Sequence, residues 1–156
     1  MLNLTEKCAA TKAFDRTLTL SFERRQKSRQ RVRLDDGGEA AIVLAPGLSL
    51  AEGDHLRASD GTIVRVHAGP EAVTVACAGD PLLLARACYH LGNRHVALQV
   101  GEGWVRYQPD HVLDAMVVGL GLAVTHENLP FEPEGGAYGG QRLGGNEGHN
   151  HAHGHG

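Results

Sequence analysis

Apolar and polar residues alternate with a period of two between about residues 14 and 75. Such alternation is typical of half-buried β-strands. The pattern predicts strands at Thr17–Phe22, Arg31–Leu34, Glu39–Leu44 and Thr62–Val66, with glycine turns at 36–38 and 60–61. Helical periodicity is absent from this stretch. We therefore expect residues 1–70 to form a small all-β domain without helices.

The period changes after residue 70, where two amphipathic helices are expected between short strands. Asp80 and Asp110 can each cap a helix start, and Gly92 and Gly121 can end the same two helices. Strands are expected at 73–77, Val96–Val100, Trp104–Tyr107 and from Leu122 onward. This β-α-β-β-α-β order predicts a ferredoxin-like sandwich over residues 71–134, and hence an α+β fold class for the chain.

The composition changes again near the end of the chain. Nine of the 21 glycines and four of the ten histidines lie between residues 135 and 156. Ordering such a segment costs about 1–2 kcal/mol per residue, with little apolar surface to offset it. We therefore expect residues 135–156 to form a disordered, flexible Gly/His-rich tail.

The tail carries the clearest chemical signal, four histidines spaced by two: His149, His151, His153 and His155. Neutral imidazole binds nickel, copper and zinc, and it is mostly neutral near pH 7. A purification tag is normally an unbroken histidine run, which this segment is not. A flexible cluster suits capture, storage or transfer of a metal ion rather than catalysis, which needs a rigid, shaped site.

Two further histidines are expected on the surface of the folded part. His95 follows a helix-ending Gly-Asn pair and precedes a strand, so its side chain should project from a loop. His111 opens the second helix. His90 lies in the last turn of the first helix, where the helix dipole favours a positive charge, so it is interpreted as a capping residue. Two ligands make a weak site, but a two-fold axis passing nearby would complete it with the same residues of a second copy.

The remaining composition excludes several classes of protein. The net charge is −3, and the six basic residues between positions 24 and 33 have no interleaved aromatics. We therefore expect this run to be either a solvated strand and loop or a docking patch for an acidic partner, and we expect no nucleic-acid partner. No stretch approaches the ~20 apolar residues of a membrane helix. Three cysteines without a C-x-x-C pair favour a reducing compartment, so we expect a soluble cytoplasmic protein. Phosphate-loop, metalloprotease and nucleophile motifs are missing, so we expect no enzyme.

Taken together, several motifs resemble the urease accessory protein E family, the nickel metallochaperones of urease. They are Tyr89–His95 (Y-H-L-G-N-R-H), Asp110–Leu113 (D-H-V-L), Gly119–Leu122, Pro130–Gly139 (P-F-E-P-E-G-G-A-Y-G), and the His-rich end. Residues 25–29 and 34–37 also look like the first domain of that family. The resemblance covers essentially the whole chain.

The resemblance implies a homodimer with a peptide-binding-like β domain and a ferredoxin-like metal-binding domain. It implies that His95 is an interfacial nickel ligand from both protomers, that His111 is auxiliary, and that the tail histidines add capacity. Nickel would pass to a urease accessory GTPase and on to the apo-urease complex. Some members carry a histidine where this chain has Pro109, so His111 is either a ligand or only a helix-start residue.

Three other functions are weighed against this one. A general metal-storage or detoxification protein would bind many ions through the tail without needing His95. A metal-dependent hydrolase would need a pocket with an open coordination position. A peptide-binding chaperone would work mainly through residues 1–70, with metal binding incidental.

Overall fold

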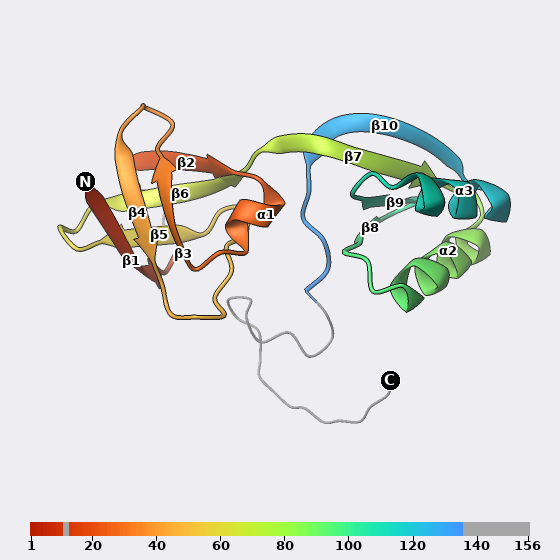
Figure 1. Ribbon diagram of the computed structural model, residues 1–156, viewed down its shortest axis with the longest axis horizontal. Helices are drawn as coiled ribbons and strands as arrows, with labels where there is room; N and C mark the ends of the chain where they lie inside the picture. The colour runs from red at the N-terminus through yellow and green to blue at the C-terminus, as the bar shows by residue number, and fades with distance from the viewer. Residues whose placement is uncertain (11–12, 136–156) are drawn as a thin grey trace, which may run out of the picture. The chain divides into compact units, whose positions relative to one another are not determined.

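The computed structural model describes residues 1–10 and 13–135, which form two compact units, Met1–Ala68 and Gly69–Glu134 (Figure 1). Both contain sheets and few helices, so the α+β class is confirmed. Within the described residues, no helix is long and apolar enough to cross a membrane.

The first unit is built from strands that are joined by short turns. Its elements are β1 (Leu2–Cys8), β2 (Arg16–Leu20), α1 (Phe22–Arg25), β3 (Arg29–Arg33), β4 (Glu39–Val43), β5 (His55–Ala58) and β6 (Ile63–Ala68). They form a six-stranded sheet in the order β2-β6-β5-β1-β4-β3. The pairs β1/β4 and β2/β6 are parallel, and the other neighbours are antiparallel.

An aliphatic core fills this unit, since aromatic residues make up only 4% of the chain. Alternate strand residues point inward, so Leu18 and Leu20 of β2, and Val64 and Val66 of β6, are all buried. Leu56 of β5 is fully buried in the same cluster. Gly37 and Gly61, in the two predicted turns, have positive φ angles of 95° and 93°, which glycine adopts without strain.

The expectation of no helix in the first unit is wrong. The chain leaves β2 after Leu20, and Ser21 caps the four-residue helix α1 by accepting a hydrogen bond from the Arg24 N–H at 3.3 Å. The predicted strand Thr17–Phe22 is therefore two residues too long. A single helical turn is too short to produce a 3.6-residue pattern. Strands β1 and β5 were also not expected.

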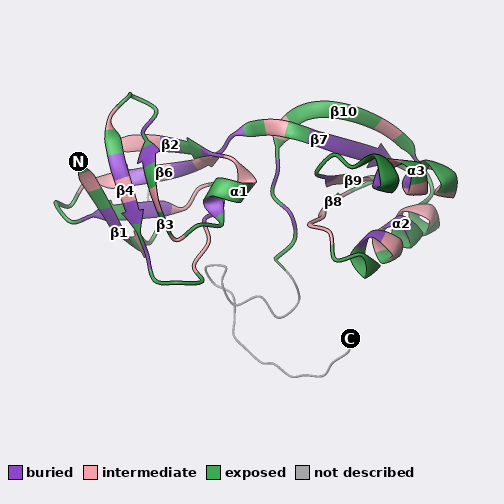
Figure 2. Ribbon diagram, viewed as in Figure 1, coloured by how far each residue is buried: buried purple, intermediate pink, exposed green. Residues whose placement is uncertain are grey.

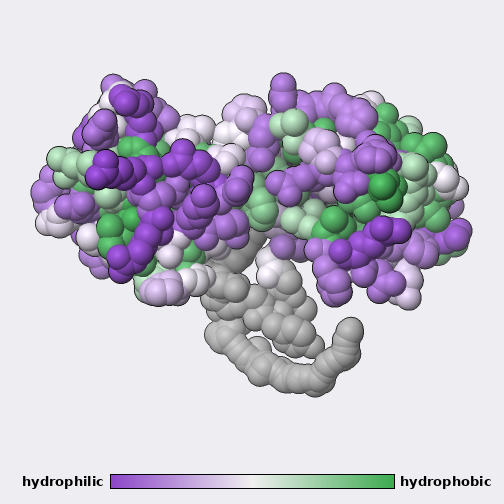
Figure 3. Space-filling view, viewed as in Figure 1, coloured by the Kyte–Doolittle hydropathy of each residue, from purple (hydrophilic) through white to green (hydrophobic). Residues whose placement is uncertain are grey.

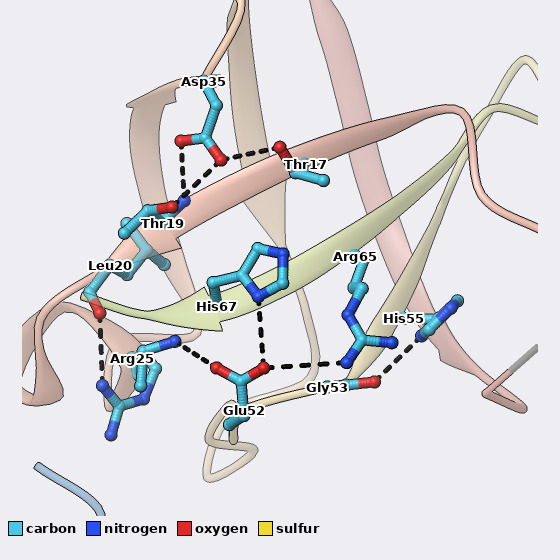
Figure 4. Close-up of polar contacts among 11 residues, drawn as sticks. Thr17, Thr19, Leu20, Arg25, Asp35, Glu52, Gly53, His55, Arg65 and His67 are labelled. Carbon is cyan, nitrogen blue, oxygen red and sulfur yellow. Dashed lines mark hydrogen bonds and ion pairs between the residues drawn. The ribbon is translucent and has the colours of Figure 1, made fainter. Parts of the chain in front are cut away.

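The basic run is not solvated throughout, contrary to expectation. Arg25 is only 2% exposed, and its guanidinium donates to the carbonyl oxygens of Leu20 and Leu50, both at 3.2 Å. Figure 4 shows the first of these contacts. The guanidinium carbon of Arg25 lies 5.8 Å from the Phe22 ring centroid, which is close enough for a cation–π contact. Arg25 therefore ties α1 to the neighbouring segments, whereas other arginines of the run stay on the surface.

The second unit places two helices against a four-stranded sheet. Its elements are β7 (Pro70–Cys77), α2 (Pro81–Asn93), β8 (Gln99–Gly101), β9 (Trp104–Tyr107), α3 (His111–Leu120) and β10 (Ala123–Pro130). The strand order is β10-β7-β9-β8, and all neighbours are antiparallel. Figure 2 shows the later part of β7 buried and β10 mostly exposed.

Three of the four predicted helix signals act as expected, whereas Gly92 does not end α2, which continues through Asn93 to its C-cap Arg94. Asp80 Oδ1 accepts the Leu82 N–H at 3.0 Å, and Asp110 Oδ1 accepts the Val112 N–H at 2.8 Å. Gly121 ends α3 with a φ of 112°. The core gathers apolar residues of both helices, β7 and β9, with Leu91 and Val117 fully buried.

Two strand boundaries in this unit also differ from the prediction. Strand β7, expected at 73–77, already begins at Pro70. The strand predicted at Val96–Val100 is β8, which starts only at Gln99, because a turn and loop follow α2. The last strand, β10, pairs with β7 along its whole length, from Ala123 with Cys77 to Pro130 with Pro70. Apart from Gly135, the predicted tail lies outside the described residues.

Candidate functional site

His95 lies in the loop between α2 and β8. Its N–H donates to the Gly92 carbonyl oxygen at 3.0 Å, and the N–H of the preceding residue, Arg94, donates to the Leu91 carbonyl oxygen at 3.1 Å. Its φ of 59° is the only positive value at a non-glycine among the described residues. This left-handed conformation turns the chain away from the helix axis and leaves the residue exposed, as the sequence predicted.

His111 is the first residue of α3 and is also exposed. Asp110 fixes the start of the helix, because its Oδ1 accepts the N–H groups of Val112 and Leu113 at 2.8 and 3.1 Å. The predicted position of His111 is therefore confirmed, whereas its role as a ligand stays a prediction. His90, in the last turn of α2, is half-buried, and its ring packs edge-on against Tyr89 at 5.3 Å.

A complete metal site is missing from the described part of a single chain. In residues 1–10 and 13–135, no three His, Cys, Asp or Glu side chains lie close enough together to hold a metal ion. His95 and His111 are thus not joined there by a third such ligand. The four predicted tail ligands, His149, His151, His153 and His155, lie outside the described residues.

A polar cluster that the sequence did not indicate connects α3 to strands of the sheet. The Tyr107 hydroxyl donates to Asp114 Oδ1 at 2.7 Å, and His126 Nε2 lies 2.8 Å from Asp114 Oδ2. Thr74 of β7 pairs with Tyr107 of β9 on one side and with His126 of β10 on the other. Cross-strand partners share a face of the sheet, so these three residues form a row, with Asp114 of α3 joined to both ends.

The protonation states in this cluster follow from its surroundings. Burial raises the pKa of Asp114, but the hydrogen bonds from His126 and Tyr107 act against burial, and the pKa of Asp114 lies below its usual value. Burial and the bond to Asp114 raise the pKa of Tyr107, so the phenol stays protonated. Because an ionised carboxylate only accepts, His126 must donate from Nε2, which assigns its tautomer.

This tautomer leaves Nδ1 of neutral His126 as the ring atom with a free lone pair. The His126 side chain is 62% exposed, against 19% for Asp114. A carboxylate that holds one imidazole nitrogen while the other faces outward is the usual support of a metal-ligating histidine. His126 is therefore a third accessible imidazole in this unit. Sequence spacing could not reveal it, because Asp114 and His126 come from different elements.

Both histidines of the first unit contact other groups of that unit. His55 is buried, and its Nδ1 lies 2.9 Å from the Gly53 carbonyl oxygen. His67 Nδ1 lies 3.1 Å from Glu52 Oε2, and the Arg65 guanidinium lies 3.7 Å from the same oxygen (Figure 4). The positive charge of Arg65 disfavours a cation at that carboxylate.

Cysteine adds little to the ligand set. Cys8, Cys77 and Cys88 are all free thiols. Burial raises the pKa of Cys88, which keeps the thiol protonated and unsuited to metal binding. The accessible imidazoles in the described part of the second unit are His95 on a loop, His111 at the start of α3 and His126 on β10. Such an arrangement can bind a borderline metal ion weakly and can complete its coordination with ligands from another chain.

Models of known protein families match the sequence of this chain. A model of the N-terminal domain of the UreE urease accessory protein matches residues 3–69, and a model of its C-terminal domain matches residues 71–156. The two matches together span nearly the whole chain.

Individual relatives agree with these models, and each is named urease accessory protein UreE. The protein of Alkalilimnicola ehrlichii is 59% identical over 140 residues, which cover 90% of this chain and 86% of the relative. That of Vibrio parahaemolyticus is 54% identical over 85% of this chain and 83% of its own length. That of Citrobacter koseri is 49% identical over 99% of both chains. The chain therefore belongs to the UreE family of urease accessory proteins.

Proposed function

We propose that this protein is a nickel-binding metallochaperone that delivers Ni²⁺ for assembly of the urease active site. Family membership gives it a role in urease maturation as an accessory protein, distinct from the urease enzyme itself. The ion is cargo in this proposal, and the protein catalyses no reaction.

The observation that carries the proposal is the position of His95. Its imidazole is exposed on a loop whose backbone is fixed by two hydrogen bonds, and the described residues supply no three-ligand site around it. A fixed donor with an incomplete ligand set among the described residues binds an ion only together with further donors, either from residues 136–156 or from a second molecule. Incomplete coordination also favours release, because few protein ligands must be exchanged.

We propose that a second copy of the chain supplies the missing donors. In a homodimer with His95 near the two-fold axis, each protomer would contribute the same imidazole to one ion. His111 would act as an auxiliary ligand, and His149, His151, His153 and His155 would add capacity or feed the central site. These donors also suit copper and zinc, so selectivity for nickel would come from the partners.

The proposal extends to the partners and the location. Nickel would pass to a urease accessory GTPase and from there to the apo-urease complex, in the cytoplasm. The second unit would provide the metal-binding domain, in a ferredoxin-like arrangement that its β-α-β-β-α-β order and antiparallel strand order support. The first unit would serve as a peptide-binding-like domain.

The test is a calorimetric nickel titration of the untagged full chain, with the molecular mass measured in parallel. His95→Asn is the preferred variant, because asparagine removes the imidazole yet tolerates the left-handed backbone at φ 59°. His67→Asn is the matched control, since His67 is a histidine held by Glu52 in the other unit. We expect one tight ion per dimer, lost in His95→Asn and retained in His67→Asn.

Delivery is tested separately, by activation of apo-urease in the presence of the GTPase. We expect His95→Asn to abolish delivery, whereas a chain truncated after Gly148 should retain it. Several equivalent weak ions that persist in His95→Asn and vanish on truncation would contradict the proposal. That result would identify a metal-storage or detoxification protein that works through its tail.

A further inference from the structure

Strand β3 exposes a row of arginines that metal binding does not use. Its residues alternate, so that Val32 is buried while Arg29, Arg31 and Arg33 are exposed. Residues two apart on a strand share a face and lie roughly 6.5–7 Å apart along it. Figure 3 shows hydrophilic side chains gathered over the face on which α1 and β3 lie.

A further guanidinium is held in place beside this row. Arg24 of α1 donates from Nε to Gln30 Oε1 at 2.8 Å and from Nη2 to the Arg31 carbonyl oxygen at 2.7 Å. The Gln30 amide in turn donates to the Arg24 carbonyl oxygen. These bonds fix the plane of the guanidinium, and Nη1 is left without a partner among the described residues. A pre-positioned arginine loses little entropy when it binds an oxyanion.

Arg24, Arg31 and Arg33 line one groove, which we call the arginine groove. Its volume is about 230 Å³, and Met1, Val32, Glu39 and Ala40 complete its lining. Glu39 is the only carboxylate among these residues, and it lies 3.7 Å from Arg33 with both side chains more than 60% exposed. So loose and exposed a pair contributes little. Arg33 Nη1 also donates to the Gly37 carbonyl oxygen at 3.1 Å, so both contacts of Arg33 are exposed ones that a partner can replace. The groove therefore carries an excess of positive charge on a chain whose net charge is −3.

Strand β3 lies at the end of the sheet, and among the described residues β4 is its only strand neighbour. At the two ends of the β3/β4 pair, the Leu34 N–H donates to the Gly38 carbonyl oxygen and the Leu44 N–H donates to the Ser28 carbonyl oxygen. The backbone N–H and C=O groups of even-numbered β3 residues therefore point toward β4, and those of odd-numbered residues point outward. Arg24 already occupies the outward carbonyl of Arg31. A partner therefore cannot add a full strand here without displacing Arg24, and recognition falls to the guanidinium groups.

We propose that the arginine groove docks an acidic, extended segment of a partner protein. In an extended chain, carboxylates at alternate positions repeat at the same spacing as Arg31 and Arg33, and each can form a bidentate pair with a guanidinium. Nucleic acid is disfavoured because the groove is lined by no aromatic side chain on which bases could stack. This docking proposal rests on the peptide-binding-like role proposed for the first unit and names its ligand class, and it does not depend on nickel binding.

The probe is a short fluorescein-labelled peptide in which Glu alternates with Ser, titrated with the full chain and followed by fluorescence anisotropy. We expect Arg31→Glu to weaken binding roughly tenfold or more, because it replaces attraction with repulsion. Arg31→Gln, which removes the charge without reversing it, should give a smaller loss in the same direction. Affinity should also fall as salt rises.

The matched control is Arg57→Glu, which reverses an exposed arginine on β5 of the same sheet that lies 3.5 Å from Glu6. It should leave peptide affinity within about twofold, since it lies outside the groove. Circular dichroism confirms that each variant is folded. Nickel titration of Arg31→Glu should match that of the parent chain, so a failed nickel proposal and a failed docking proposal are told apart.

Three outcomes would overturn the inference. Equal losses in Arg31→Glu and Arg57→Glu would show that the peptide responds only to total charge. Equal binding of a peptide with Gln in place of every Glu would show that carboxylates are not recognised. Tighter binding of an oligouridylate RNA, lost in Arg31→Glu, would assign the groove to nucleic acid instead.

Discussion

The two units use histidine in opposite ways. In the first unit His55 is buried against a backbone carbonyl, and His67 is held by Glu52 beside Arg65. In the second unit His95 and His111 are exposed at the end of one helix and the start of the next. An imidazole is thus a structural group where its partners surround it and an available ligand where a loop or cap presents it to solvent.

Each unit also contains a carboxylate that is bonded to a histidine, and the difference between these pairs is informative. Glu52 receives the Ala68 N–H at 2.8 Å and has Arg65 beside it, so its charge is largely used within the first unit. Asp114 receives the neutral Tyr107 hydroxyl and His126, so its charge orients an exposed imidazole. A carboxylate–histidine pair therefore stabilises a loop in one unit and orients an exposed imidazole in the other.

The largest expected effect comes from truncating one residue in each core. Leu56 and Leu91 are both fully buried, so Leu56→Ala and Leu91→Ala should each cost about 2–5 kcal/mol of unfolding free energy. Trp104 is the only tryptophan of the chain and lies in β9, so its fluorescence reports on the second unit. In urea, Leu91→Ala should shift the fluorescence transition, and Leu56→Ala should shift the circular dichroism but spare the fluorescence. A fluorescence shift of equal size in both variants would show that the units unfold together.

The next effect concerns the charge of Asp114. Asp114→Asn should lower the unfolding free energy by about 1–3 kcal/mol at neutral pH, because it weakens the charge-assisted bond to His126 and the bond from Tyr107. The pKa of Asp114 is lowered in the folded state, so its stabilisation is present above the unfolded pKa and is lost as pH falls through the folded pKa. Stability measured from pH 7 down to acid should therefore converge for parent and variant. A constant difference across that range would refute the assigned charge.

A smaller effect is expected from the backbone at His95. Its φ of 59° suits glycine, so His95→Gly should be more stable than His95→Ala by about 0.5–1 kcal/mol. Nickel affinity should fall equally in both variants if the imidazole is the ligand. Urea unfolding followed by Trp104 fluorescence measures the first quantity, and calorimetry measures the second. Retained nickel binding in the glycine variant would remove His95 from the ligand set.

The smallest effect is expected at Glu52, the first-unit counterpart of Asp114. Partial burial raises its pKa, but the Ala68 N–H, His67 and Arg65 outweigh burial and lower the pKa. Its side chain is 36% exposed, so solvent screens these contacts, and Glu52→Gln should cost about 0.2–1 kcal/mol. Nickel binding should not change. A loss larger than that of Asp114→Asn would reverse the difference inferred between the two units.

Much of the local structure could be predicted from the sequence, because short-range rules govern it. Asp80 and Asp110 cap their helices as expected, since a cap involves only residues two or three apart. The helix α1 and the burial of Arg25 could not be predicted, because they depend on carbonyl groups that the fold brings to one guanidinium. The exposed positions of His95 and His111 followed from helix boundaries, whereas His126 emerged only when β10 paired with β7 below Asp114.

The sequence by itself determined both helix starts of the second unit, the end of α3, the loop position of His95 and, through its motifs, the UreE family. These features depend on neighbouring residues, which the order of the chain already specifies. Only the tertiary structure decided which charges are used internally and which remain available. Arg25 and Glu52 bond to groups far along the chain, and His126 is oriented by a carboxylate from another element. Burial and partner geometry are properties of the folded chain, because they exist only when distant segments meet.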